Sequence, residues 1–474
     1  MILPLILWIC LIVLVLPVYV LIVVPLGIWR IIVDLLAKTR ADLVEPLDSR
    51  DLVFTGDDYY GKPRKCVISC IILNGKVTLE TLKECFQKNV LDKPNLFRLN
   101  CRPRRFLGYW YWQRTEIQED KQYLQDDKVY KQEELNALLP DWVAEGYASD
   151  TPLWELKLCP LDGDRTALVM KLHHLVADGV SFMYLLEEFC DGGWTNLQIP
   201  DTKPFSLPHW IYAWYNFPWK ALKAYWLARC RKGFRPKGAS EGFTSYAAFP
   251  MEKLKVVRRS NKCLFPSVLA GMISNALHKQ HAKNGKEIPD VVRMVVPTPY
   301  PNRPKNALVN HVGWIHATMP IGDPLAIKKF ERSVRKSYIS GLHGIMWNMF
   351  RGLYLLPSPC LAVYTGWGER NLPPVVLTSI PGSLTPVSLL GQPVHCSYPT
   401  LALGCSTGCN ACMTTYADAG YFSMRVSKDV ISSQEQLDEL VQKYMQEELD
   451  NMYQDAINAE NKKLNPYVQI DIAT

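Results

Sequence analysis

The pattern of hydrophobic and polar positions divides the chain into an apolar N-terminal segment and two mixed halves. The first 29 residues contain no charged side chain. A helix of that length, at about 1.5 Å per residue, exceeds the roughly 30 Å hydrocarbon core of a bilayer. The pattern therefore predicts an N-terminal transmembrane helix. The competing interpretation, a cleaved signal peptide, lacks a basic first region and a small-residue cleavage site.

Charges near the apolar segment predict its orientation. Arg30, Lys38 and Arg40 follow the segment and no basic residue precedes it, which places everything beyond it in the cytosol. Pro17 and Pro25 leave open a second arrangement, a bent hairpin that enters and leaves one leaflet with the body on the same side. Either anchor predicts a membrane protein with cytosolic domains; the membranes that we expect are the endoplasmic reticulum and lipid droplets, with the plasma membrane as the alternative.

The first half after the anchor alternates between strand and helix patterns. A β-branched run closed by Asn-Gly is typical of a strand and turn, and apolar residues at helical spacing follow it. The expected strands are 66–73, 153–159 and 167–172, and the expected helices begin at Thr78 and Val180.

Residues 201–240 change in character and form the predicted boundary between two domains. They contain four tryptophans, with Pro218 dividing two expected short helical pieces. One helical face carries Trp219, Leu222, Trp226 and Cys230, and it is flanked by Lys220, Lys223, Arg229 and Arg231. Such a stripe suits side chains that reach from an apolar surface to phosphates. An ordinary aromatic linker helix packed between domains is the alternative.

The second half again mixes strands with helices. Expected strands cover 294–297, 311–319, 375–380 and 421–426, and a capping-box pattern at Ser432 and Glu435 opens a final helix. Alternation in both halves predicts an α/β or α+β pair of sandwich domains. The expected divisions are an anchor with its basic flank (1–40), a first domain (50–200), a linker (201–240) and a second domain (241–474).

Composition and charge narrow the classes of function. The chain is 48% hydrophobic and 21% charged, as expected for a folded protein. Its net charge of +7 is too modest to indicate nucleic acid, but it suits anionic lipid head groups or a polyanionic molecule such as coenzyme A. The fourteen cysteines are scattered, and a cytosolic body would keep them reduced.

The stretch KLHHLVADGVS, residues 171–181, carries the clearest chemical signal. His173 and His174 close an apolar strand, and because successive side chains alternate, only one of them faces a given cavity. Neutral imidazole can take a proton from a hydroxyl at cytosolic pH, which makes His174 a candidate general base. Asp178 lies on the following turn and can brace it, and Gly179 permits a tight backbone there.

At these residues the sequence resembles a known family. HHLVADG matches the HHxxxDG signature of coenzyme A-dependent acyltransferases, and Pro152-Leu153-Trp154 matches the PLW motif of the wax ester synthase/diacylglycerol acyltransferase family. Further matching stretches are Pro94-x-Leu96-x-Arg98, Asn310-x-x-Gly313 with Met319-Pro320, and Ile380-Pro381-Gly382. The chain departs from the family at Ser379 to Ser383, where Asn-x-Pro-Gly-Pro is usual, and this difference affects substrate choice.

The resemblance implies a fold and a reaction. It implies two chloramphenicol-acetyltransferase-like sandwich domains with a tunnel between them, and acyl-coenzyme A as co-substrate without a permanently bound cofactor or metal. A fatty acyl group would pass to a lipophilic alcohol, either diacylglycerol or a fatty alcohol, at a membrane and without nucleic acid as a partner. His174 would act as base, with Asp178, Gly179 and His173 in the same motif. Asn310 and Thr378 are weaker candidates for binding the oxyanion or substrate.

Three other hypotheses remain at this point. The same scaffold could serve a small soluble alcohol or amine, or a non-catalytic protein that binds or transfers lipid. The stretch CSTGCNAC, residues 405–412, has the C-x₃-C-x₂-C spacing that holds a [4Fe-4S] cluster in radical enzymes. It lies late in the chain and lacks the usual aromatic residue before the last cysteine, so an iron-sulfur enzyme is the weakest alternative.

Overall fold

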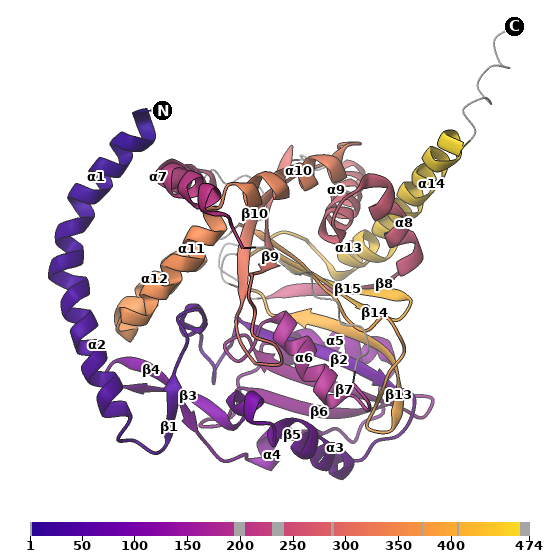
Figure 1. Ribbon diagram of the computed structural model, residues 1–474. Helices are drawn as coiled ribbons and strands as arrows, with labels where there is room; N and C mark the ends of the chain where they lie inside the picture. Colours follow the sequence, from indigo (N-terminus) through magenta and orange to yellow (C-terminus); the bar gives the residue numbers. More distant parts are fainter. Residues whose placement is uncertain are drawn as a thin grey trace, which may run out of the picture.

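The structure, a computed structural model, describes residues 2–193, 204–229, 241–285, 289–370, 373–404 and 407–464. Two six-stranded sheets lie at its centre, and a long N-terminal helix runs along one side (Figure 1). Each sheet contributes to its own buried apolar cluster. The predicted mixed α/β class with two sheet-rich domains is confirmed.

The first sheet has the strand order β12-β13-β2-β7-β6-β5. Its strands are β2 (Cys66–Leu73), β5 (Tyr123–Gln125), β6 (Trp154–Leu161), β7 (Arg165–His173), β12 (Ser388–Leu389) and β13 (Gln392–Leu401). The accompanying helices are α3 (Leu79–Phe86), α4 (Glu119–Gln122), α5 (Gln132–Trp142) and α6 (Gly179–Phe189). A small sheet beside it contains β1 (Leu43–Pro46), β3 (Cys101–Phe106) and β4 (Tyr109–Arg114). The expected strands and helix starts of this half are all present.

The second sheet has the order β10-β9-β11-β14-β15-β8. Its strands are β8 (Gly242–Pro250), β9 (Val291–Pro299), β10 (Val312–Pro320), β11 (Val375–Ile380), β14 (Cys409–Tyr416) and β15 (Ala419–Ser427). The helices of this half are α8 (Met251–Asn261), α9 (Phe265–Lys283), α10 (Ala326–Ile339), α11 (Leu342–Phe350), α12 (Ser358–Arg370), α13 (Gln434–Asp438) and α14 (Met445–Leu464). The final helical segment is capped by Ser433, one residue later than expected, because the Ser433 hydroxyl accepts the Gln436 N–H.

Short 3₁₀ or π-helical segments join these elements. They are Tyr19–Val23, Asp51–Phe54, Gln87–Leu91, Pro94–Asn100, Arg351–Leu355 and Glu439–Tyr444.

A crossover joins the two halves and modifies the expected division at residue 241. Strands β12 and β13 leave the second half and pair within the first sheet, where β13 runs antiparallel to β2. Strand β2 is almost entirely buried and therefore needs a hydrogen-bonding neighbour on each side. Its second neighbour comes from more than 300 residues further along the chain, so local sequence patterns could not reveal it.

The N-terminal apolar segment is one continuous helical rod and not a hairpin. Helix α1 (Ile2–Val18) passes through a π-helical turn into α2 (Val24–Ala37). Prolines remove backbone donors, and the π-turn between Pro17 and Pro25 lets the rod continue, with the Val24 N–H donating to the Tyr19 carbonyl. Among the described residues, Leu5–Ala37 is the one helix long and apolar enough to cross a bilayer.

The linker helix differs from its expected form. Helix α7 (Leu207–Arg229) is a single helix that includes Pro218, where two short pieces were predicted. Trp219, Leu222 and Trp226 are exposed on it, while Cys230 and Arg231 lie outside the described residues.

The Pro152-Leu153-Trp154 motif positions a neighbouring segment. The buried Trp154 indole donates a 2.8 Å hydrogen bond to the Leu99 carbonyl, next to Arg98. Replacement of Trp154 by Phe leaves that carbonyl without its donor, and we expect a loss of about 1–3 kcal/mol in unfolding free energy. Thermal unfolding in detergent measures this effect. Trp110→Phe is the control, because no protein acceptor for its indole is found in the described part of the chain; equal losses in both variants would contradict this role of the hydrogen bond.

Candidate active site

His174 follows the end of β7 and is held there by backbone contacts. Its N–H donates to the Lys65 carbonyl at 2.8 Å, while the His173 N–H donates to the Leu153 carbonyl at 3.1 Å. The two imidazoles have different neighbours, since the His173 ring contacts Asp57 and Tyr59 and the His174 ring contacts Asn310 and Phe54. The Pro152-Leu153-Trp154 motif thus contacts His173 through a backbone hydrogen bond.

The His174 ring has a defined orientation. Its Nδ1 lies 3.0 Å from Asn310 Oδ1, and the ring stacks on Phe54 with centroids 4.5 Å apart. The Asn310 amide nitrogen donates to Asp51 Oδ1 and to the His174 carbonyl, both at 2.9 Å, so its oxygen faces the imidazole. The oxygen can only accept, which assigns the proton to Nδ1 and leaves the Nε2 lone pair available. Burial lowers the pKa of His174, and the ring is therefore neutral near pH 7.

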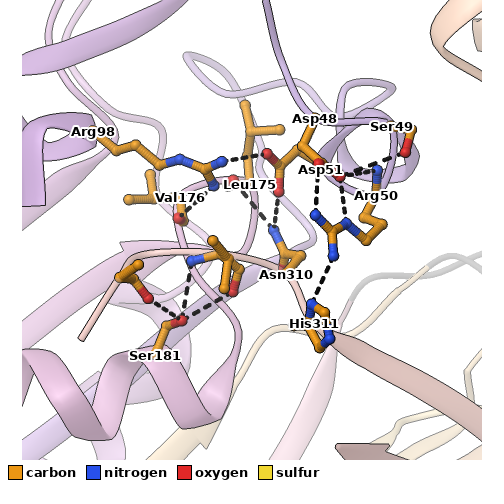
Figure 2. A network of polar contacts seen from close by, with 12 residues as sticks. Asp48, Ser49, Arg50, Asp51, Arg98, Leu175, Val176, Ser181, Asn310 and His311 are labelled. Atoms are coloured by element: carbon orange, nitrogen blue, oxygen red, sulfur yellow. Dashed lines mark hydrogen bonds and ion pairs between the residues drawn. The ribbon is translucent and has the colours of Figure 1, made fainter. Parts of the chain in front are cut away.

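A buried ion pair lies behind Asn310. Figure 2 shows the Asp51 carboxylate between the Asn310 amide and the Arg98 guanidinium, with Arg98 Nη2 at 2.8 Å from Asp51 Oδ2. Asp51 is fully buried, and this desolvation raises its pKa. Arg98 also donates to the Val176 carbonyl at 3.4 Å. The sequence pattern did not single out Asp51, and Arg98 entered only through a matching stretch.

Asp178 connects the two halves of the molecule. Its carboxylate caps α6 by accepting the Ser181 N–H at 2.9 Å, and it binds both terminal nitrogens of Arg303 at 2.6 and 2.8 Å. It also accepts the His311 N–H at 2.7 Å. Both partners of the ion pair are almost fully buried. The position of Asp178 supports the predicted bracing role, and its partner Arg303 is a residue that the sequence did not indicate.

A second arginine contacts the same segment. Arg50 Nη1 lies 2.6 Å from His311 Nδ1, and Arg50 also pairs with Asp48 (Figure 2). The His311 Nε2–H donates to the Pro301 carbonyl, so Nδ1 is the acceptor for Arg50. Residues 301–311 are thereby held to the first domain at several points.

His173 is a structural residue in this arrangement. It is fully buried, its Nε2 lies 3.0 Å from Asp57 Oδ2, and its Nδ1 accepts the Leu175 N–H at 3.0 Å. Both ring nitrogens are therefore occupied. Its removal is expected to lower stability, since Asp57 would keep a buried charge without this partner.

Gly179 lies in close contact with a side chain of the second half, and its backbone angles are ordinary. A Cβ at this position would meet Ile380 Cδ1 at 2.6 Å. Ile380 ends β11, and Thr378 lies two residues earlier on the same face of that strand. The end of β11 therefore lies beside the start of α6.

The amide hydrogens of Asn310, the other candidate for binding the oxyanion, already have protein acceptors. This favours a positioning role for Asn310 over binding of an oxyanion.

The cysteine-rich stretch does not form a metal site in the described part of the chain. Cys409 and Cys412 are both buried in β14, and three residues apart along a strand they point to opposite faces. Cys405 lies outside the described residues. Within those that are described, no group of His, Cys, Asp and Glu side chains suited to a metal is found.

Comparisons with known proteins identify the class and then the family. The fold matches that of condensation domains, including the first condensation domain of the CDA synthetase (TM-score 0.57, 16% identity, 88% of this chain and 98% of that one). A variant of the starter condensation domain of rhizomide synthetase RzmA, solved with C8-CoA and Leu-SNAC, also matches (TM-score 0.56, 12% identity, 89% and 96%). A comparison with curated sequences finds no match.

The family follows from the sequence profiles. Residues 131–210 match the wax ester synthase/diacylglycerol acyltransferase catalytic domain, and residues 310–452 match the C-terminal domain of the same family. The wax ester synthase/diacylglycerol acyltransferase from Marinobacter aquaeolei VT8 has a similar structure (TM-score 0.61, 17% identity, 87% of this chain and 100% of that one). The chain belongs to the wax ester synthase/diacylglycerol acyltransferase family and is an acyltransferase.

The Asp178–Arg303 pair can be tested by a double-mutant cycle. Asp178→Asn and Arg303→Gln each leave a buried group without its partner, and we expect each to cost about 3–5 kcal/mol. The double variant should lose less than the sum, with a coupling of about 1–3 kcal/mol, measured by unfolding in detergent. The exposed pair Lys76–Asp164 provides the matched control and should show almost no coupling. Additive losses at Asp178 and Arg303 would contradict a direct contribution of the pair.

Proposed function

We propose that this protein transfers a fatty acyl group from acyl-coenzyme A to a lipophilic alcohol, and so forms triacylglycerol or a wax ester. The observation that carries the proposal is the His174 imidazole, whose Nδ1–H is held by Asn310 and whose Nε2 is left as a base. Family membership supplies the acyl-transfer chemistry. The complex of the similar condensation domain with C8-CoA supports acyl-coenzyme A as the donor.

The proposed reaction has two proton transfers and no acyl-enzyme. His174 Nε2 accepts the proton of the alcohol, and the alcohol oxygen attacks the thioester carbonyl carbon. The tetrahedral intermediate collapses by breaking its C–S bond, and the coenzyme A thiolate takes the proton from the imidazolium. Asn310 would stabilise the imidazolium through the Nδ1–H contact, and Thr378 stays a candidate for the oxyanion. No metal or permanently bound cofactor enters this mechanism.

We also propose that the N-terminal helix is a retained membrane anchor with the catalytic domains in the cytosol, at the endoplasmic reticulum or lipid droplets. Its base is part of the folded body. Arg30 is buried against the rings of Tyr109, Tyr111 and Tyr354, and it pairs with Asp34 at 3.1 Å. A cleaved signal peptide would leave these aromatic side chains uncovered, so the packing supports retention.

The acceptor class is tested with purified full-length protein and labelled palmitoyl-coenzyme A. Hexadecanol, diacylglycerol, a sterol and a short soluble alcohol are offered in parallel, and the products are identified by mass spectrometry. We expect lipid esters with His174, and a loss of about 10²–10⁴-fold in His174→Ala, the usual contribution of a general base. His395→Ala, at an exposed histidine on β13, is the control. Normal turnover without His174 would refute the base, and esters of the soluble alcohol alone would refute the lipid acceptor.

The pH dependence follows from the His174 environment. Burial lowers the pKa of His174 below its usual value near 6.5, and the neutral base exists above that pKa. As pH falls through the pKa, the base is protonated and activity is lost. We therefore expect the acidic limb of kcat/KM to have its midpoint below about pH 6.5. Asn310→Ala should lower kcat and move this limb to still lower pH, because the imidazolium loses its acceptor. A midpoint above 6.5 in the unaltered protein contradicts the assignment.

A further inference from the structure

Exposed apolar side chains gather on one side of the molecule. In Figure 1 the rod of α1 and α2 lies on the same side as α7, α11 and α12, while the two large sheets lie away from it. Helix α1 is exposed and apolar all round. Exposed apolar residues on this side also include Leu207, Ile211, Trp214, Trp219, Leu222 and Trp226 on α7, Met349 on α11, and Val363 and Trp367 on α12.

The N-terminal part of α1 is bonded to α7. The Trp8 indole donates to the Trp214 carbonyl at 3.0 Å, and the two indole rings lie 6.2 Å apart. This carbonyl is available because Pro218, four residues later, has no N–H to donate to it. In a medium without water, a carbonyl freed by proline needs another donor. Trp8 supplies that donor, so Pro218 and Trp8 form one interaction.

The other end of the rod is fixed to both halves of the body. Asp34 accepts hydrogen bonds from Tyr111 at 2.5 Å and Tyr354 at 2.7 Å. Trp8 and Arg30 are separated by about 33 Å along the helix, which is close to the hydrocarbon thickness of a bilayer. The rod is therefore attached to the body at two points that lie about that distance apart. If it crossed the bilayer, α7 with its lysines would have to lie at the depth of the far leaflet.

A basic cavity borders the apolar face. It has a volume of about 580 Å³ and lies between α7 and α10. Its walls include Lys220, Lys328, Arg332, Arg335 and Lys336 together with Glu331. Excess positive charge beside an apolar surface fits the phosphates of lipid head groups, and it would repel a second copy of the same face.

We propose that the side formed by α1, α7 and α12 docks on an anionic phospholipid leaflet, with α1 lying in the plane of that leaflet and head-group phosphates in the α7–α10 cavity. The inference rests on the membrane anchor of the proposed function and deepens it. It changes the expected transmembrane helix into an in-plane one, because the same helix is attached to the body at both ends.

This arrangement brings the leaflet close to the candidate active site. The inner side of α12 packs on the segment that follows Asp51–Phe54, where a Cβ on Gly56 would meet Thr365 Oγ1 at 2.7 Å. Glu369 of α12 forms an ion pair with Lys65, whose carbonyl accepts the His174 N–H. Phe54 stacks on the His174 ring. A lipid alcohol that leaves the leaflet beside α12 would thus be separated from the candidate active site by little more than the width of one helix.

The orientation is tested in sealed microsomes with full-length protein that carries an N-terminal epitope tag. An in-plane α1 leaves both the tag and the catalytic domains on the cytosolic side, so added protease should remove the tag. A tag protected until detergent is added would show a spanning helix and overturn the proposal. Protein that fails to float with the membranes would instead refute the anchor itself, which separates the two failures.

The contact between α1 and α7 is tested by cross-linking in the same membranes. With Cys10 and Cys360 changed to serine, Trp8→Cys with Trp214→Cys should form an intramolecular disulfide on mild oxidation. Leu14→Cys with Trp214→Cys is the control, since Leu14 lies about 9 Å further along the helix. No cross-link in the first pair, or a cross-link between two chains, would overturn the in-plane arrangement; the second result would identify another copy as the occupant.

The basic cavity is tested by the lipid that purifies with the full-length protein in mild detergent. Lys328→Glu, Arg332→Glu and Lys336→Glu together should lower retained anionic phospholipid by at least about tenfold, because each cation near an anionic surface contributes about fivefold. Lys88→Glu, Lys121→Glu and Lys128→Glu, all exposed in the first domain, are the matched control with the same change of charge. Equal retention in both triple variants would overturn the head-group site.

Discussion

The buried pair of Asp178 and Arg303 is the interaction on which the candidate active site depends. It fixes the first turn of α6, in the first half of the chain, to the segment of the second half that carries Asn310 and His311. The pair thereby supports the position of Asn310, whose own contacts with Asp51 and with the His174 carbonyl orient its oxygen toward the His174 ring. The contacts of Asp178 with Arg303 and with the Ser181 and His311 N–H groups thus support a positioning role for this carboxylate over a role in proton transfer.

Because these polar groups are buried, their contacts both stabilise the fold and restrict the relative position of the two domains. Asp178, Asp51 and Asn310 are all almost fully buried, and each has a partner across the domain boundary or within the first domain. A buried charge or amide that loses its partner is strongly destabilising, whereas misplacement by a few tenths of an ångström already weakens its hydrogen bonds. Alternative relative positions of the two domains are therefore disfavoured. The crossover of β13 into the first sheet adds a backbone ladder to the same constraint.

The sequence predicted what depends on local order and missed what depends on distant contacts. Strand periodicity and the HHxxxDG pattern located His174 at a strand end and Asp178 at a helix start, since both features lie within ten residues. Arg303, by contrast, lies in a proline-rich stretch with no regular pattern, and it meets Asp178 across 125 positions. Asp51 belongs to no sequence motif that we recognised, and only its buried position beside Asn310 identifies it as part of the candidate active site.

The same distinction applies to the membrane face. Apolar length and flanking charge suggested a helix that spans the bilayer, because a sequence window shows these two properties but no contact with a distant segment. The indole of Trp8 and the carbonyl released by Pro218 are separated by some 200 positions, so their pairing could be found only in three dimensions. Once they are paired, a proline that looked like a break between two short helices becomes the reason that α7 can hold α1. An acyltransferase with this arrangement would meet its two substrates from different phases: the soluble thioester from water, and the alcohol from the leaflet beside α12.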